Sequence, residues 1–401
     1  MARVLIAQST CKQYRVPFFT GLQTSLQKDG IDLVVAYSPP NRVHAARRDD
    51  ADLPGSLGLK VRGHWFFDRL LYQHLWKEIW RADLVIVGPE SKFLINPVLL
   101  LFSALRLKRV AFWGLGPNMH PDKVEISERI KDKLVRMVDW WFAYTPSVKE
   151  YLLGRGVPPD RITNVQNATD TNTLRSLMSS VGNEEAATAK RQLTGNSESK
   201  IGFYCGLIGD IKAIPLLLEA ARRVKQRCPE FHLVIVGEGP DRQWLEEAVR
   251  SEPWIHYLGS KYGRESALLY RIADVFLLAG TAGLAIVDSF AAGLPMIATR
   301  LNTHPPEVTY LRDGENSIVS AHRATDFGDA IIKVLTNPEL MEKLRGGAIA
   351  DGSKYTMEAM VENFSDGIKR CLRRYRTRHQ FHPTFKRLSN STINRLNLED
   401  R

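Results

Sequence analysis

The sequence predicts an α/β protein built from two doubly wound parallel-sheet domains with a cleft between them. Short apolar runs, as expected of buried parallel strands, alternate with helical segments through most of the chain. This rhythm stops over residues 180–199, which are small and polar like a linker, and then starts again. With 401 residues the chain is also long for a single hydrophobic core.

Strands and helices alternate in the first half of the chain, which is the rhythm of βαβ units. A helix is expected from Pro17 to about Lys28, because proline is favourable at a helix start. The apolar runs of strand length are Arg3–Gln8, Ile31–Tyr37, Leu84–Val87 and Val110–Trp113.

A glycine-rich turn follows Trp113 and ends at His120. Open α/β sheets bind their ligands at the carboxyl ends of strands, so His120 is a candidate for contact with a substrate. A polar turn residue without a role is the alternative. The carboxylates of Asp50 and Asp52 follow no strand and stand beside two arginines, as in a solvated turn, so we expect no metal site there.

Residues 65–80 combine an unusual number of aromatic side chains with basic ones, and we expect them to form a helix. The aromatic residues are too many for one narrow core stripe. Two interpretations stay open. The helix is wedged between the sheet and the domain interface, or it forms a surface that touches lipid, since Trp and basic residues suit that boundary.

The second half repeats the strand–helix rhythm and ends in the most informative stretch. Val275–Ala279 is a buried strand, the residues from Gly280 to Gly283 form a turn, and Leu284–Ala292 is a helix that carries Asp288. A glycine turn before a helix suits an anion, and a carboxylate inside that helix suits hydroxyl groups. The stretch therefore indicates a nucleotide-sugar site, the alternative being an ordinary βαβ unit with a solvent-facing acid.

We divide the chain into a first domain, a linker, a second domain, a C-terminal helix and a basic tail without regular structure. The predicted bounds are 1–180, 181–199, 200–352, 353–378 and 379–401.

The net charge of +11 is unevenly distributed. Residues 366–401 hold ten Lys or Arg against three Asp or Glu, whereas residues 186–365 hold 20 against 22. The central region is therefore no surface for nucleic acid, and none is expected as a partner. The basic tail, together with residues 65–80, suits an anionic membrane surface.

The four cysteines show neither paired nor metal-type spacing, which favours a reducing compartment. The N-terminal apolar run is too short for a signal peptide, and no segment reaches the ~20 apolar residues of a spanning helix. We expect a cytoplasmic protein that associates peripherally with the inner face of the cell membrane.

Several short motifs of the second half resemble the family-4 retaining glycosyltransferases of the GT-B fold. The likeness covers about residues 200–350 well and residues 1–180 loosely. It rests on five segments in order, which are Gly206–Ala213 with Leu217–Ala220 after it, Val236–Pro240, Tyr257–Gly259, Pro306–Glu307 and Asp313–Asn316.

The chain departs from this family at two positions. The paired glutamates of the family, separated by seven residues, fall here on Gly280 and Asp288, and the arginine of the phosphate clamp is Leu207. A subset of the family is similar to this chain in carrying Gly-x-x-Gly-Leu, here Gly280 to Leu284, in place of the first glutamate.

The resemblance implies a metal-independent, retaining glycosyltransferase without a cofactor, whose C-terminal helix crosses back to the first domain. It would transfer sugar from a nucleotide-diphosphate sugar to a lipid-linked or saccharide acceptor, in surface polysaccharide or glycolipid biosynthesis. Lys212 and Asp288 are implied as catalytic residues, Lys212 on the departing diphosphate and Asp288 on the ribose. The expected acceptor contacts are Tyr14, Arg15 and His120. The expected donor contacts are Gly206, Gly237, Glu238, Gly259, Gly280, Thr281, Ala282, Gly283 and Leu284.

Two other functions remain open. One is a nucleotide-sugar 2-epimerase of the same fold, which would need several acids and histidines facing the sugar. The other is a non-catalytic nucleotide-sugar-binding partner subunit, since two positions of the clamp have changed. Release of nucleoside diphosphate in the presence of lipid acceptors would separate an enzyme from a binding protein.

Overall fold

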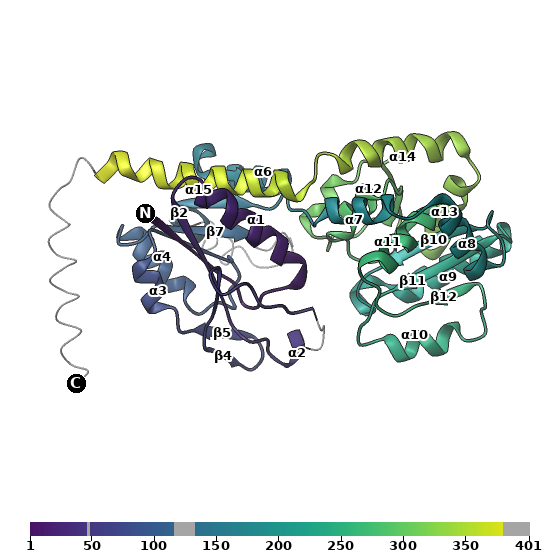
Figure 1. Cartoon of the computed structure of the whole chain (residues 1–401), viewed down its shortest axis with the longest axis horizontal. Helices are drawn as coiled ribbons and strands as arrows, with labels where there is room; N and C mark the ends of the chain where they lie inside the picture. Colours follow the sequence, from purple (N-terminus) through teal and green to yellow (C-terminus); the bar gives the residue numbers. More distant parts are fainter. Residues whose placement is uncertain (46–48, 116–132, 380–401) are drawn as a thin grey trace.

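The computed structural model describes residues 1–45, 49–115 and 133–379 and contains two parallel β-sheets, each surrounded by helices. Figure 1 shows the two domains side by side, joined along one edge. The predicted fold class is confirmed: two Rossmann-like domains follow one another, and a C-terminal helix returns to the first.

The first sheet has seven parallel strands in the order β3-β2-β1-β6-β7-β8-β9. The strand β1 pairs with β2 on one side and with β6 on the other, so the direction of winding reverses between β1 and β6. The strands are β1 (Ala2–Ala7), β2 (Ile31–Tyr37), β3 (Gly58–Lys60), β6 (Leu84–Val87), β7 (Val110–Gly114), β8 (Trp140–Ala143) and β9 (Ile162–Asn164). The helical segments of this domain are η1 (Gln13–Arg15), α1 (Val16–Gln27), α2 (Arg42–Ala45), α3 (Trp76–Arg81), α4 (Asn96–Ala104), α6 (Pro146–Gly154) and η2 (Pro159–Arg161).

The second sheet repeats this plan with six parallel strands in the order β12-β11-β10-β13-β14-β15. Its reversal point lies between β10 and β13. The strands are β10 (Lys200–Cys205), β11 (Phe231–Val236), β12 (Ile255–Tyr257), β13 (Val275–Leu278), β14 (Met296–Thr299) and β15 (Ser317–Ser320). The helices are η3 (Asp210–Lys212), α9 (Ile214–Arg227), α10 (Arg242–Val249), α11 (Gly263–Ile272), α12 (Ala285–Ala291), η4 (Pro306–Tyr310), α13 (Ala324–Leu335) and α14 (Pro338–Gly352).

The prediction of one helix over residues 65–80 is wrong. The segment forms an antiparallel hairpin of β4 (Gly63–Phe66) and β5 (Leu70–Gln73), followed by the short helix α3. Phe67 and Asp68 both have positive φ angles, of 51° and 54°, which make the tight turn of the hairpin. The aromatic content hid the period of two that a strand shows, because aromatic side chains stand on both faces of the hairpin.

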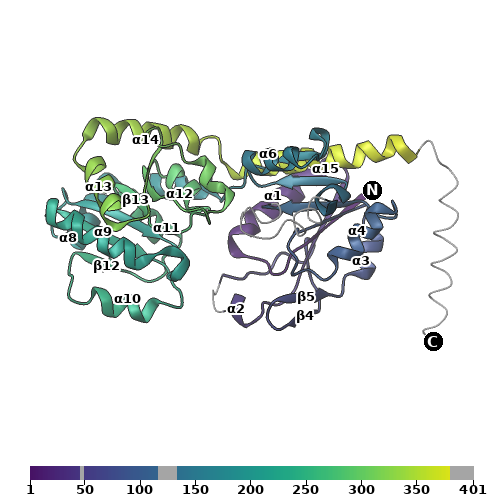
Figure 2. The same cartoon turned by 180° about the vertical axis from the view of Figure 1, so that it is seen from behind.

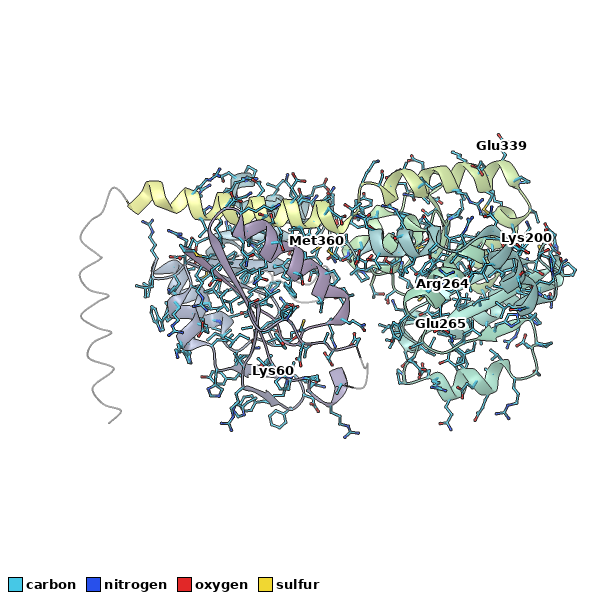
Figure 3. The ribbon with its side chains drawn as sticks, in the orientation of Figure 1. Lys60, Lys200, Arg264, Glu265, Glu339 and Met360 are labelled. Carbon is cyan, nitrogen blue, oxygen red and sulfur yellow. The ribbon has the colours of Figure 1, made fainter. Side chains whose placement is uncertain are left out.

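The chain leaves the first domain earlier than the predicted division at residue 180. Helix α7 (Thr171–Ser179) begins with Asp170 as its N-cap and packs against α11 and α12 of the second domain. The predicted linker at 181–199 contains helix α8 (Asn183–Thr194), which also packs on α11. Glu185 of α8 forms an ion pair with Arg264 of α11 across this contact, and Figure 3 labels Arg264. The small polar residues of segment 181–199 therefore belong largely to a solvent-facing helix rather than to a linker without structure.

Helix α15 (Met357–His379) carries the chain back to the first domain, where it lies against α1, β8 and β9 (Figure 2). Its buried Phe364 stacks on Phe142 of β8 with ring centroids 4.2 Å apart. The helix begins at Met357 rather than at the predicted residue 353, because the Thr356 hydroxyl accepts from the Ala359 N–H and ends the preceding turn. None of the helices in the described part of the chain is both long and apolar enough to cross a membrane.

Candidate functional site

The predicted donor glycines lie in one row at the carboxyl edge of the second sheet. Gly206 follows β10, Gly237 follows β11, Gly259 lies just beyond β12 and Gly280 lies just beyond β13. Because β10 and β13 flank the reversal point of the sheet, Gly206 and Gly280 border the crevice in which doubly wound folds bind their ligands.

Gly237 is required by the contact between two of these loops. Its φ is +140°, and a Cβ atom there would stand 1.7 Å from the Gly206 carbonyl oxygen. The Gly206 N–H donates to the Val236 carbonyl and the Gly237 N–H donates to the Gly259 carbonyl. These glycines therefore shape the edge, while their own N–H groups are used within the protein. The Glu238 carboxylate forms an ion pair with Arg242 at 3.0 Å on the surface.

Lys212 and the turn from Gly280 to Gly283 are packed directly together. A Cβ atom on Gly280 would lie 2.2 Å from the Lys212 carbonyl carbon. The Thr281 N–H donates to the Ile211 carbonyl at 2.8 Å, and the Lys212 Nζ donates to the Thr281 carbonyl at 2.6 Å. The absence of a Cβ atom on Gly280 lets η3 and the turn pack this closely, with the Lys212 ammonium on the Thr281 carbonyl.

The burial and the hydrogen-bond partner of Lys212 suit a side chain that binds an anion. Burial lowers the pKa of its ammonium to about 8. The ammonium donates to the Thr281 carbonyl, and no carboxylate of the described residues pairs with it, so an incoming phosphate would bring it a full counter-charge.

Asp288 lies on α12 directly after this turn and is half-buried. Its carboxylate accepts from the Thr169 hydroxyl at 2.6 Å, in the segment that joins the two domains. Burial, with a smaller contribution from Asp170, raises the pKa of Asp288 to about 6. The Asp288 charge also contributes to the raised pKa of Cys205, behind the effect of burial, which shows that the carboxylate lies near the end of β10. Lys212, the turn and Asp288 thus lie at the same carboxyl edge of the second sheet.

His304 is a residue of this edge that the sequence did not indicate. It lies in the loop between β14 and η4, and its Nδ1 accepts from the Ala282 N–H at 2.9 Å. A histidine shortly after the carboxyl end of a strand was the available signal, but its partner on another strand's loop is visible only in three dimensions.

The predicted acceptor residues differ in their surroundings. Tyr14 is exposed, whereas Arg15 is buried and its guanidinium lies 5.0 Å from the ring centres of both Tyr14 and Trp113. The Arg15 Nη1 also donates to the sulfur of Met360 on α15, at 3.8 Å; Figure 3 labels Met360 at its place on this helix. Arg15 therefore joins the first domain to the returning helix. His120 lies outside the described residues.

A second set of contacts joins the domains through η4. The buried Glu307 accepts from Asn167 at 2.6 Å, and the Tyr310 hydroxyl donates to the Tyr144 and Asn167 carbonyls at 3.4 Å. Burial raises the pKa of Glu307, although Asn167 and the charge of Arg15 act in the opposite direction.

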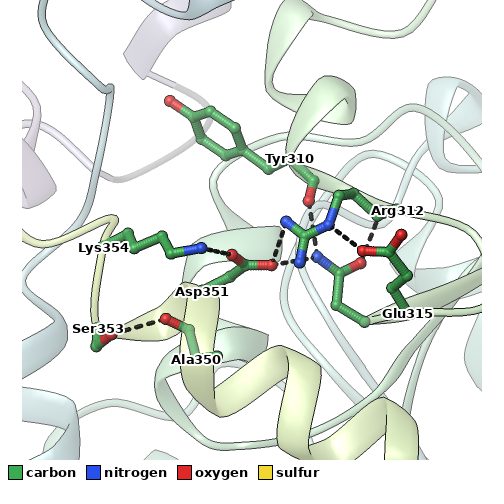
Figure 4. Close-up of polar contacts among 8 residues, drawn as sticks. Tyr310, Arg312, Glu315, Ala350, Asp351, Ser353 and Lys354 are labelled. Atoms are coloured by element: carbon green, nitrogen blue, oxygen red, sulfur yellow. Dashed lines mark hydrogen bonds and ion pairs between the residues drawn. The ribbon is translucent and has the colours of Figure 1, made fainter.

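A polar network behind η4 keeps this element in place (Figure 4). The buried Asp351 at the end of α14 accepts from Asn316 at 2.6 Å and pairs with Arg312 and Lys354. Asn316 in turn donates to the Tyr310 carbonyl at 2.9 Å. These partners together hold the pKa of Asp351 below its usual range despite its burial.

No group of three or more His, Cys, Asp or Glu side chains that could hold a metal ion occurs within residues 1–45, 49–115 and 133–379.

The family match to known proteins falls on the second domain. Residues 198–337 match the family model described as "Glycosyl transferases group 1". The chain is 28% identical over 191 residues to the alpha-monoglucosyldiacylglycerol synthase of Acholeplasma laidlawii, covering 46% of this chain and 47% of that protein. It is 32% identical over 141 residues to the phosphatidyl-myo-inositol mannosyltransferase of Mycobacterium tuberculosis, covering 33% and 36%. The chain thus spans less than half the length of these two relatives.

Among solved structures, HepE of Anabaena in complex with UDP has a TM-score of 0.67 to this chain at 13% sequence identity. The likeness covers 92% of this chain and 100% of HepE, so it extends over both domains. The chain therefore has the GT-B fold of glycosyltransferases, with a glycosyl transferases group 1 region in its second domain.

Proposed function

We propose that the protein is a retaining glycosyltransferase that uses a nucleotide-diphosphate sugar and needs no metal ion. The observation that carries the proposal is the direct packing of Lys212 on the glycine turn at the reversal point of the second sheet. This arrangement supports an anion site, and the neighbouring carboxylate of Asp288 supports contacts with ribose hydroxyl groups.

In the proposed reaction the bond between the anomeric carbon and the diphosphate breaks, and a bond to an acceptor hydroxyl oxygen forms on the same face of the sugar. The acceptor proton passes to the leaving diphosphate oxygen, so no separate base is needed. Lys212 stabilises the negative charge that grows on the diphosphate as it departs.

We further propose a lipid-linked acceptor, in keeping with the names of the two relatives, a glucosyldiacylglycerol synthase and a phosphatidyl-myo-inositol mannosyltransferase. An aromatic and basic surface of the first domain supports this. The tip of the hairpin, Phe67, is 91% exposed, and Trp80 of α3 is 52% exposed. The Trp80 ring lies 5.3 Å from that of Phe102 on α4, and the same region exposes Leu101, Leu105 and Leu107. The same segments of the chain carry the basic residues Arg62, Arg69, Lys77 and Arg106, whereas Arg81 pairs with Glu78 and Lys108 donates to the Trp80 and Ala82 carbonyls.

Such a surface fits the interface of an anionic bilayer, where each basic residue contributes about 1 kcal/mol. The basic residues at the end of α15 support membrane contact less strongly than residues 65–80 do. Lys369 pairs with Asp29, Arg370 with Asp366, and Arg374 with Asp160, so these three charges already have partners within the protein.

The first experiment is a thermal-shift assay of the intact protein with a panel of nucleotide sugars. We expect one of them to raise the melting temperature, and then to release nucleoside diphosphate when a glycolipid acceptor is added, with or without EDTA. A product with the anomeric configuration of the donor supports retention. Binding without turnover on any lipid or saccharide acceptor would instead favour the non-catalytic partner subunit.

Vesicle flotation tests the membrane surface. We expect the intact protein to float with anionic vesicles, and the double variant Phe67→Ser, Trp80→Ser to float less. Protein lacking residues 380–401 serves as the comparison for the tail. Equal flotation of wild type and double variant, or no flotation at all, would contradict the proposed surface.

A further inference from the structure

His304 makes two hydrogen bonds that determine which ring nitrogen carries the proton. Its Nδ1 lies 2.9 Å from the Ala282 nitrogen, a backbone N–H that can only donate. Its Nε2 lies 2.7 Å from the Thr299 carbonyl oxygen, which can only accept. The ring must therefore be neutral, with its proton on Nε2.

The glycine turn is held from two opposite sides. Thr281 is tied to η3, since its N–H donates to Ile211 and its carbonyl accepts from the Lys212 ammonium. The next residue, Ala282, is tied to the β14–η4 loop by His304. The position of the Thr281 carbonyl, and with it that of Lys212, thus depends on the imidazole on the far side of the turn.

The charges around His304 favour its neutral form. Burial lowers the pKa of the ring, and the nearby Lys212 and His322 lower it further, while the bond to Thr299 acts in the opposite direction. A protonated ring would lose its bond from Ala282 and would repel the Lys212 ammonium.

We propose that His304 is a positioning residue of the donor site, which holds the glycine turn so that Lys212 meets the diphosphate of the donor. The inference rests on the proposed function, because it assigns Lys212 to that diphosphate. It adds a residue that acts through the turn rather than by touching the ligand.

Calorimetric binding of inorganic pyrophosphate tests this without knowledge of the base or the sugar. The proteins compared are wild type, His304→Ala, Lys212→Ala and the double variant. We expect His304→Ala to bind pyrophosphate about tenfold more weakly than wild type. Because His304 acts through Lys212, we expect the double variant to bind no more weakly than Lys212→Ala alone.

Two further proteins separate positioning from a general effect on folding. His304→Gln retains one acceptor and one donor, so it should recover most of the pyrophosphate affinity. His322→Ala is the matched control, since the His322 Nδ1 contacts the Thr299 hydroxyl at 2.9 Å rather than the glycine turn. We expect it to bind like wild type. Nitrogen NMR of the wild-type imidazole, which depends on no variant, should show a neutral ring protonated on Nε2.

The possible outcomes test the positioning role of His304 separately from the proposed glycosyltransferase function. If the effects of His304→Ala and Lys212→Ala add, or if the ring is protonated on Nδ1, the positioning role is wrong and the proposed function stands. If wild type binds neither pyrophosphate nor any nucleotide sugar, both are wrong.

Discussion

Lys212 and Asp288 are the two residues whose chemistry defines the candidate site. Lys212 was named through the family resemblance and Asp288 also from its place in the helix after the glycine turn, and both lie at the carboxyl edge of the second sheet. Burial lowers the pKa of Lys212 to about 8 and raises that of Asp288 to about 6, so both groups titrate close to neutral pH.

Replacing Lys212 with alanine should raise the barrier of sugar transfer by ~2–4 kcal/mol, because a preorganised cation on the leaving group is lost. The pKa of about 8 adds a pH signature. The ammonium is charged below this pH and neutral above it, so kcat/KM of wild type should fall as the pH rises through about 8. Lys212→Arg should lack this alkaline decline.

The matched control for Lys212 is Lys225→Ala. Lys225 also has a pKa lowered by burial and donates to backbone carbonyls, but it lies near the start of β11, at the opposite edge of the sheet. Turnover by Lys212→Ala equal to that of Lys225→Ala would remove Lys212 from the mechanism.

Asp288→Asn should weaken donor binding by roughly 1.5–3 kcal/mol, because charge-assisted hydrogen bonds to hydroxyl groups are lost. The same change should stabilise the free protein at neutral pH. The folded-state pKa of about 6 lies above the ordinary value of 3.8, so the contribution of Asp288 to stability is complete below pH 4 and is lost as the pH rises through 6.

Denaturant unfolding at pH 4.5 and pH 7.5 measures this effect. Wild type should lose on the order of 2 kcal/mol relative to Asp288→Asn between these two pH values. An unchanged difference between the two proteins would show that the carboxylate is not buried in the way described.

At the scale of elements, the glycine turn after β13 explains why the first glutamate of the resembled family has no counterpart. The turn lies directly on the backbone of η3, where a side chain at position 280 has no room. The absent carboxylate is therefore a consequence of how the loop is packed, and restoring it should fail.

Gly280→Glu should destabilise the protein by about 1–3 kcal/mol or more and abolish donor binding, because its Cβ would lie 2.2 Å from the Lys212 carbonyl carbon. Gly283→Ala is the control, since a Cβ there meets nothing within 4 Å and the φ of Gly283 is not in the left-handed region. Thermal unfolding compares them. A Gly280→Glu protein as stable as Gly283→Ala, with donor binding intact, would contradict the packing argument.

At the scale of the whole molecule, α15 completes the hydrophobic core of the first domain with residues that lie more than 350 positions from the N-terminus. Phe364 is fully buried among Phe18, Trp113 and Phe142. The first domain can therefore reach its full stability only when the end of the chain has returned to it.

Phe364→Ala should cost about 3–5 kcal/mol, by loss of buried area and by the cavity that remains. Ile349→Ala, on the exposed face of α14, should cost little. Denaturant unfolding followed by tryptophan fluorescence measures both, because Trp113, Trp140 and Trp141 report on the first domain. Equal stability of the two variants would mean that α15 does not contribute to this core.

The sequence by itself determined the fold class, because buried parallel strands and amphipathic helices have different periods that a single chain reveals. It also located the glycine turn and Asp288, since both lie within one short segment whose local pattern carries the signal, whereas Lys212 was named through the family resemblance. The hairpin at residues 63–73 was missed because its aromatic side chains stand on both faces and hide the alternation of a strand.

Only the tertiary structure decided how these segments meet. His304 reaches Ala282 across 22 residues, Thr169 reaches Asp288 across 119, and Arg15 reaches Met360 across 345. Contacts of this kind arise from strand order and from the return of the last helix, and no local pattern encodes which loops a sheet brings side by side. The residue types of the site could therefore be predicted from the sequence, whereas their partners and their pKa shifts depend on the burial that the assembled fold creates.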